Sequence, residues 1–150
     1  MCIRDSFYAT RPVVAILTVD NYEELMKGAN DSAKSAMRSG IDDRLSQWVA
    51  PAQGLFCRYE RDRYLFVFEE RFLAQFQEGK FSILETVREV ASPSGIQATL
   101  SIGIGKDAES LGELFQYAAL SVEMALSRGG DQVVVKNRFC LLYTSDAADD

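Results

Sequence analysis

Three arginines lie within six residues of one another, at Arg58, Arg61 and Arg63, and Asp62 separates the last two. A guanidinium group is planar and always protonated, so it can donate two parallel hydrogen bonds to a phosphate or a carboxylate. The cluster predicts a site for nucleotide phosphates or for an acidic partner surface, with Arg58, Arg61, Asp62 and Arg63 as candidate nucleotide-binding residues. Alternating charges at an exposed turn can also serve only to keep a protein soluble, and the residues alone leave that alternative open.

Several kinds of chemistry are excluded by composition. The 150 residues include no histidine, so neither imidazole catalysis nor histidine-ligated zinc is available. The three cysteines form an odd, unspaced set, which does not indicate a disulfide framework and favours the reduced cytosol. The net charge of −6 and the lack of a basic stripe argue against a nucleic-acid binder. No apolar run reaches the roughly 18 residues of a membrane span, so we expect a soluble domain without direct membrane contact.

The arginine cluster needs a scaffold, and the surrounding residues predict a β-hairpin. Residues 55–59 and 64–68 are aromatic-rich runs that suit two strands, joined by a polar tip of four residues at 60–63. Upstream, residues 13–19 form a β-branched apolar run that suits a strand buried on both faces.

Helices are expected between and after these strands. Asn21 and Glu24 have the spacing of a capping box that opens a brief helix, and Gly28 is a natural place for it to end. A second helix is expected from Asn30 or Asp31 to Pro51, and a helical stretch over 70–90 is expected to break near Gly79.

The last third of the chain predicts a strand, a helix and a strand. Residues 96–102 alternate between apolar and polar types, which predicts a strand with one buried face, and Gly103 and Gly105 are expected to end it rather than to form a phosphate loop. Ser110 and Glu113 have the spacing of another capping box. The inner stripe of the helix that they open is expected to comprise Leu111, Leu114, Phe115, Ala118, Val122 and Ala125. The residues Gly-Gly-Asp at 129–131 are expected to form its terminating turn, before a short strand at 133–135.

The predicted order β, α, α, β, β, α, β, α, β resembles the GGDEF fold, and four segments carry the resemblance. Residues 18–22 read TVDNY where the family has Asp-x-Asp-x-Phe, and residues 58–64 read RYERDRY where it has Arg-Tyr-Gly-Gly-Asp-Glu-Phe. Residues 101–103 match the family's Ser-Ile-Gly, and residues 125–133 match its final helix and strand. The resemblance implies an α/β sandwich of the palm-like nucleotide-cyclase type, with a central, mostly antiparallel five-stranded sheet and helices packed on it.

Two segments narrow the resemblance to a subfamily. Residues 80–84, KFSIL, and residues 127–133, SRGGDQV, are similar to the modified GGDEF domain of GdpP/YybT-type cyclic-di-AMP phosphodiesterases of bacteria. The resemblance implies a cytoplasmic signalling domain cut from a membrane-anchored parent hydrolase, with a PAS domain before it and a DHH-family phosphodiesterase module after it. We expect the domain to span residues 11–138. Residues 1–10 and 139–150 resemble translated adapter sequence and are expected to be non-native flanks.

The resemblance also implies a lost activity. Cyclising GTP requires two divalent cations held by oxygen ligands. Thr18 replaces the family's first metal aspartate, and Arg63 replaces its hairpin glutamate. The residues that recognise guanine correspond to Met26 and Lys27, and the phosphate-contacting lysine of the final helix corresponds to Leu126. We therefore expect a degenerate domain without diguanylate cyclase activity.

Asp20 and Asp62 are the acidic pair that keeps a role in the family, and together they are the candidate ligands for one metal ion. The alternative is that Asp62 is a turn residue and Asp20 a helix-entry residue. The expected function is regulatory nucleotide binding, with ATP or a cyclic dinucleotide as ligand. The alternatives are a weak ATPase that uses Mg²⁺ with ATP, or a structural coupling domain that forms a homodimer.

Overall fold

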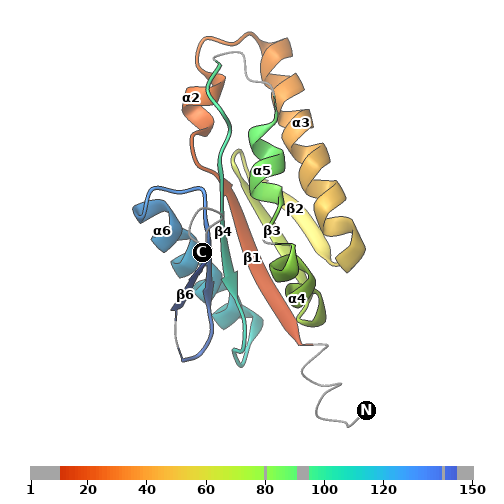
Figure 1. Cartoon of the computed structure of the whole chain (residues 1–150), viewed down its shortest axis with the longest axis vertical. Helices are drawn as coiled ribbons and strands as arrows, with labels where there is room; N and C mark the ends of the chain where they lie inside the picture. The colour runs from red at the N-terminus through yellow and green to blue at the C-terminus, as the bar shows by residue number, and fades with distance from the viewer. Residues whose placement is uncertain (1–10, 80, 91–94, 140, 145–150) are drawn as a thin grey trace.

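The computed structural model describes residues 11–79, 81–90, 95–139 and 141–144, so the predicted flank at 1–10 lies outside the described residues, as does Lys80. Figure 1 shows the arrangement of its strands and helices. The strands are β1 Pro12–Val19, β2 Leu55–Glu60, β3 Arg63–Glu69, β4 Leu100–Gly105, β5 Val133–Lys136 and β6 Leu141–Thr144. The helices are α2 Tyr22–Met26, α3 Asp31–Val49, the 3₁₀ turn η1 Ala50–Ala52, α4 Arg71–Glu78, α5 Ile83–Arg88 and α6 Leu111–Ser127.

All six strands form one sheet in the order β2-β3-β1-β4-β5-β6. β4 and β5 pair in parallel, joined by α6, and the other four pairings are antiparallel. β1 lies in the middle of this order, and every residue from Val13 to Val19 is buried. The prediction of a strand buried on both faces is therefore confirmed, and so is the mostly antiparallel α/β architecture.

Helices cover both faces of the sheet. In Figure 1, α3, α4 and α5 lie in front of the sheet and α6 lies behind it. The larger core fills the α3 side and includes Phe66, Leu45 and Leu84. The smaller core lies under α6 and includes Ile16 and Val122. Within the described ranges, no helix combines the length and the apolar character needed to cross a membrane.

Two of the three predicted helix starts that follow have a side-chain cap, and the third does not. Asn30 caps α3 by accepting a hydrogen bond from the Ala33 N–H at 2.8 Å, as its residue type favours. Ser110 caps α6 by accepting from the Glu113 N–H at 3.1 Å. The capping box at Asn21 was wrong, because the Asn21 side chain donates to the Gln97 carbonyl at 2.8 Å and does not cap α2.

The fourth strand differs from its prediction. It begins at Leu100 rather than near residue 96, runs to Gly105 and is buried on both faces. A Cβ on Gly103 would lie 2.3 Å from the Val122 nitrogen, and a Cβ on Gly105 would lie 2.3 Å from the Leu114 carbonyl oxygen. Gly103 therefore lies inside the strand and Gly105 is its last residue, and both pack against α6 rather than forming a phosphate loop. They allow the backbone of α6 to approach the sheet closely.

This close approach also explains an error in the predicted stripe of α6. Leu114, Ala118 and Val122 face the sheet as expected, but Leu111 is 59% exposed and Phe115 is 41% exposed. Only a narrow row of α6 residues, opposite the two glycines, contacts the sheet. Leu111 and Phe115 lie beside this row and remain exposed.

The sixth strand was not expected. β6 lies in the segment 139–150 that the sequence assigned to a non-native flank, and it pairs antiparallel with β5. An edge strand offers unpaired backbone N–H and C=O groups, and a short run such as Leu-Leu-Tyr-Thr can pair with them whatever its origin.

Candidate functional site

The hairpin tip is tighter than the sequence predicted. Glu60 pairs with Arg63 across the hairpin, so the loop consists of Arg61 and Asp62 alone, and the register shifts between Arg58 and Glu60. The Asp62 carbonyl accepts a hydrogen bond from the Val19 N–H at 2.9 Å. The tip is therefore fixed beside the end of β1.

Thr18 and Arg63 are direct partners in the ladder between β1 and β3. Thr18 is 3% exposed, and its Oγ1 has no hydrogen-bond partner among the described residues. The Arg63 guanidinium lies 3.7 Å from the Glu123 carboxylate on α6. Burial by itself lowers the pKa of Arg63. A hydrogen bond with Tyr59 and the nearby carboxylates raise that pKa by more than burial lowers it, so the net shift is upward. Arg63 is a permanent cation at this point of the sheet.

Asp20 is held by three donors from distant parts of the chain. Its carboxylate accepts hydrogen bonds from the Thr99 hydroxyl at 2.8 Å, the Ser101 hydroxyl at 2.6 Å and the Asp131 N–H at 2.8 Å. A Cβ on Gly130 would lie 2.7 Å from the same carboxylate, so that position requires glycine. The turn at 129–131 ends α6 as predicted, and it also encloses Asp20, a contact that no sequence signal indicated.

The predicted metal pair is therefore only partly brought together. The backbone of Asp62 lies next to Val19, but both carboxylate oxygens of Asp20 are engaged by other donors. Among the described residues no group of three or more histidine, cysteine, aspartate or glutamate side chains could hold a metal ion. A metal ion shared by Asp20 and Asp62 stays a prediction.

Arg58 belongs to a closed cluster with α3. Its guanidinium lies 2.5 Å from one carboxylate oxygen of Asp42, and the Tyr64 hydroxyl donates to the other oxygen at 2.5 Å. The Tyr64 side chain is 3% exposed. Burial and the Asp42 carboxylate raise the pKa of Tyr64 well above its ordinary value. We call these three residues the Asp42 cluster.

Arg61 points to α2 instead. Its guanidinium lies 2.9 Å from the Glu23 carboxylate and 5.8 Å from the centre of the Tyr22 ring. Both charged side chains are exposed, Arg61 at 74% and Glu23 at 75%. Such a pair contributes little to stability because water screens it.

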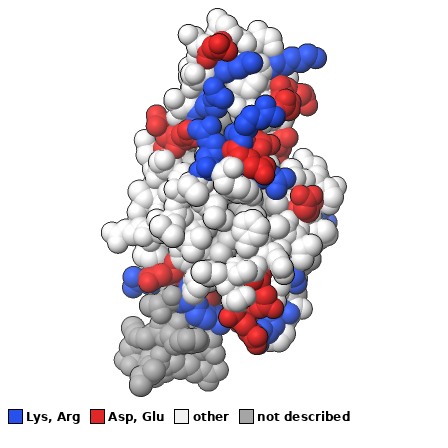
Figure 2. Space-filling model, turned by 180° about the vertical axis from the view of Figure 1, so that it is seen from behind, with Lys and Arg blue, Asp and Glu red and all other residues white. Residues whose placement is uncertain are grey.

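A pocket of about 440 Å³ lies between this tip, α2 and the beginning of α3. We call it the α2–α3 pocket. Its lining comprises Tyr22, Glu23, Met26, Lys27, Gly28, Lys34, Arg38 and Arg61. Figure 2 shows several Lys and Arg side chains, interspersed with Asp and Glu, over the upper part of the molecule, where Figure 1 places α2 and the first turns of α3.

Among the described residues, the cations of the α2–α3 pocket outnumber the carboxylates that pair with them. Four cations line it, and the one carboxylate, Glu23, is engaged by Arg61. No carboxylate of the described residues lies within 4.0 Å of Lys27, Lys34 or Arg38. Arg38 makes one weak contact, to the Tyr22 hydroxyl at 3.4 Å. None of these three cations was among the predicted site residues. The resemblance pointed to Lys27 only as a replaced guanine-recognising residue, and the spacing of Lys34 and Arg38 gives no signal until α2 and α3 pack together.

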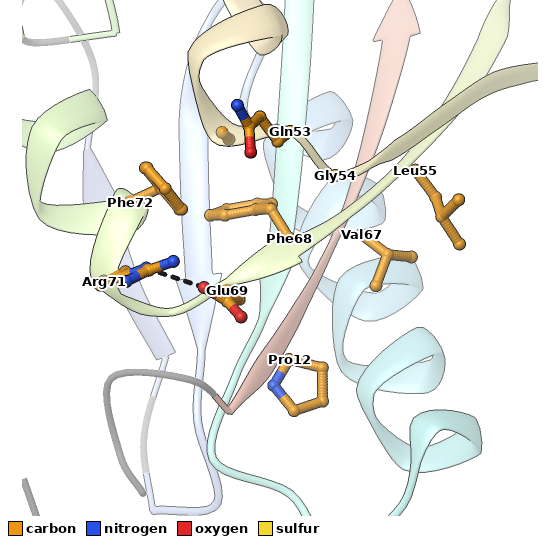
Figure 3. Close-up of a pocket in the computed structure, with 10 residues that line it drawn as sticks. Pro12, Gln53, Gly54, Leu55, Val67, Phe68, Glu69, Arg71 and Phe72 are labelled. Atoms are coloured by element: carbon orange, nitrogen blue, oxygen red, sulfur yellow. Dashed lines mark ion pairs between the residues drawn. The ribbon is translucent and has the colours of Figure 1, made fainter. Parts of the chain in front are cut away.

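The other end of the sheet has a second hollow of about 310 Å³, shown in Figure 3. Phe68, Phe72 and Leu55 line it, and its ion pair joins Glu69 to Arg71 at 2.7 Å. It contains none of the predicted site residues and its charges are paired. The α2–α3 pocket is the better candidate for ligand binding.

Comparisons with known proteins agree with this fold and subfamily. Residues 17–139 match the family model described as the GGDEF domain of GdpP-like cyclic-di-AMP phosphodiesterases. The chain is 44% identical over 137 residues to the cyclic-di-AMP phosphodiesterase GdpP of Geobacillus thermodenitrificans, covering 91% of this chain and 21% of that protein. It is 40% identical over 127 residues to GdpP of Bacillus subtilis, covering 84% of this chain and 19% of that protein.

A solved structure supports the fold independently. A diguanylate cyclase/phosphodiesterase from Caldicellulosiruptor saccharolyticus superposes with a TM-score of 0.72 at 16% identity, covering 93% of this chain and 85% of that one. The chain spans about a fifth of the length of the curated relatives it matches. It belongs to the GGDEF domains of the GdpP-like cyclic-di-AMP phosphodiesterases.

Proposed function

We propose that this chain is a degenerate GGDEF domain that binds a nucleotide in the α2–α3 pocket and regulates a cyclic-di-AMP phosphodiesterase. The observation that carries the proposal is that Lys27, Lys34 and Arg38 line a pocket of about 440 Å³ without an ion pair to any carboxylate of the described residues. Unpaired cations that converge from separate segments repel one another, and a polyanionic ligand relieves that repulsion.

The pairing of Thr18 with Arg63 supports the loss of cyclase activity. These positions correspond to two metal ligands in the related cyclases, and they face each other across the ladder. A hydroxyl and a guanidinium cannot replace two carboxylates, and the positive charge of Arg63 opposes a divalent cation nearby. Asp20 is held by three donors of the protein, so the residues present do not fit a pair of divalent cations.

The proposed activity of the parent protein rests on the names of the relatives, and its proposed neighbouring domains rest on the family resemblance of the sequence. The matched proteins are named cyclic-di-AMP phosphodiesterases, and this chain corresponds to about a fifth of each. We infer that a hydrolytic DHH-family module and a sensory PAS domain neighbour it in a membrane-anchored parent. In that arrangement the domain passes the state of its nucleotide site to the hydrolytic module.

Calorimetric titration of the 150-residue chain with ATP, GTP and cyclic-di-AMP tests nucleotide binding. We expect ATP to bind, and we expect Arg38→Gln to weaken binding about tenfold through the loss of one charge-assisted contact. Arg71→Gln is the matched control, because it removes the same charge from the first residue of α4, a helix that Figure 1 places at the opposite end of the molecule from α2. Absence of binding to every nucleotide at millimolar concentration would refute the proposal.

A structural coupling role is the second candidate, and the hairpin arginines favour it. Arg61 pairs with α2 through Glu23, Arg58 with α3 through Asp42, and Arg63 with α6 through Glu123. One hairpin thus contacts three helices through its charges. Light scattering across a range of concentrations tests whether the domain also forms a homodimer, because a closed dimer has a defined mass.

A further inference from the structure

The side chains that line the α2–α3 pocket suit the phosphate groups of a nucleotide better than its base. We propose that this pocket recognises the polyphosphate group itself, whatever base is attached to it. The inference rests on the proposed nucleotide-binding function and specifies which chemical group of the ligand the pocket contacts.

The cations of the pocket come from three separate segments. Lys27 follows the end of α2, and Lys34 and Arg38 lie four residues apart on α3, so they share one face of that helix. Arg61 reaches the pocket from the hairpin tip. A single charge would meet only one or two of these groups, whereas a chain of phosphates can contact cations from all three segments at once.

Base recognition needs an exposed aromatic face or polar groups that read the base edge. Tyr22 is 6% exposed and Met26 is 7% exposed, so neither offers an open platform. Glu23 has the one carboxylate among the described residues that line the pocket, and this carboxylate is paired with Arg61. No amide side chain lines the pocket among the described residues.

The ion pair of Arg61 can change directly when a ligand binds. Its pair with Glu23 is exposed on both sides, so a phosphate can replace the carboxylate at small cost. Because the Asp62 carbonyl is bonded to the Val19 N–H, the tip remains attached to the sheet during this exchange. The ligand would therefore join α2 and α3 to the hairpin.

A ligand series on the 150-residue chain tests the inference, with EDTA present and at low salt. Inorganic tripolyphosphate, ATP, GTP, AMP, adenosine and cyclic-di-AMP are titrated under one condition. We expect ATP and GTP to bind within about threefold of each other, and tripolyphosphate to bind within about tenfold of ATP. AMP and cyclic-di-AMP should bind at least about tenfold more weakly than ATP, since they carry fewer negative charges in total and lack a chain of linked phosphates, and adenosine should not bind.

Variants locate the binding. Lys34→Gln and Arg38→Gln should each weaken tripolyphosphate and ATP by the same factor, while Arg38→Lys should restore part of the affinity and Arg71→Gln should leave it unchanged. Circular dichroism of each variant checks that the fold is retained.

The outcomes separate this inference from the proposed function. A preference of more than about tenfold between ATP and GTP, or ATP binding without tripolyphosphate binding, would overturn the polyphosphate inference alone. Binding of tripolyphosphate but of no nucleotide would overturn nucleotide binding as the function. No binding of any ligand would overturn both.

Discussion

One turn of α3 separates two opposite arrangements of charge. At Asp42 the helix supplies the carboxylate that pairs with Arg58 and accepts from Tyr64, so every charge in that cluster has a partner. Four residues earlier, Arg38 faces the α2–α3 pocket, where no described carboxylate lies within 4.0 Å of it. Both regions join α3 to the same hairpin. The Asp42 cluster fixes the hairpin in place, whereas the α2–α3 pocket has cations that we propose bind a ligand.

The largest effect that tests this comparison is expected from Asp42→Ala. It leaves the Arg58 guanidinium and the buried Tyr64 hydroxyl without their shared acceptor, which should lower the free energy of unfolding by about 2–3 kcal/mol. Urea denaturation measures the change. Asp43→Ala is the matched control, because it removes the same charge from an exposed neighbouring position and should cost less than about 0.5 kcal/mol. Equal losses in the two variants would contradict a special role for Asp42.

A smaller effect is expected from Tyr64→Phe, which removes one hydrogen bond and should cost about 1 kcal/mol at pH 7. The pKa of Tyr64 is raised in the folded state, so the native protein holds this proton more tightly than the unfolded chain does. Its contribution to stability is therefore complete below about pH 10 and is lost as the pH rises further.

Urea denaturation between pH 7 and pH 11 checks this pH dependence. The difference in stability between the native chain and Tyr64→Phe should be constant at first and should shrink above about pH 10. A difference that stays constant over the whole range would show that Tyr64 does not titrate differently on folding.

The smallest effect should come from the pocket. Arg38→Gln should leave the free energy of unfolding unchanged or raise it by up to about 0.5 kcal/mol, because it relieves repulsion between unpaired cations. Arg58→Gln should instead lower it by about 0.5–1 kcal/mol through loss of the Asp42 pair. A loss for Arg38→Gln as large as that for Arg58→Gln would remove the distinction between the two regions.

Much of the fold could be predicted because its signals are local. The apolar run at 13–19, the paired aromatic runs of the hairpin and the caps at Asn30 and Ser110 each depend on residues close together in the chain. The errors arose where a distant segment changed a local preference. Asn21 bonds to Gln97 rather than capping its own helix.

The candidate site was predicted only in part for the same reason. The arginine cluster identified the hairpin tip, but the sequence could not show that Arg58 is bound to Asp42 while Arg61 reaches the α2–α3 pocket. It also gave no reason to select Lys34 or Arg38, whose proposed role depends on the lack of an ion pair to any described carboxylate.

By itself, the sequence determined the order of the elements, the resemblance to one family and the presence of Thr18 and Arg63 where that resemblance implies two metal ligands. Only the tertiary structure decided which charges are paired and which are left unpaired. Side-chain type fixes the sign of each charge, but the energy of a charge depends on its distance to other charges and to water, and the folded chain alone sets those distances.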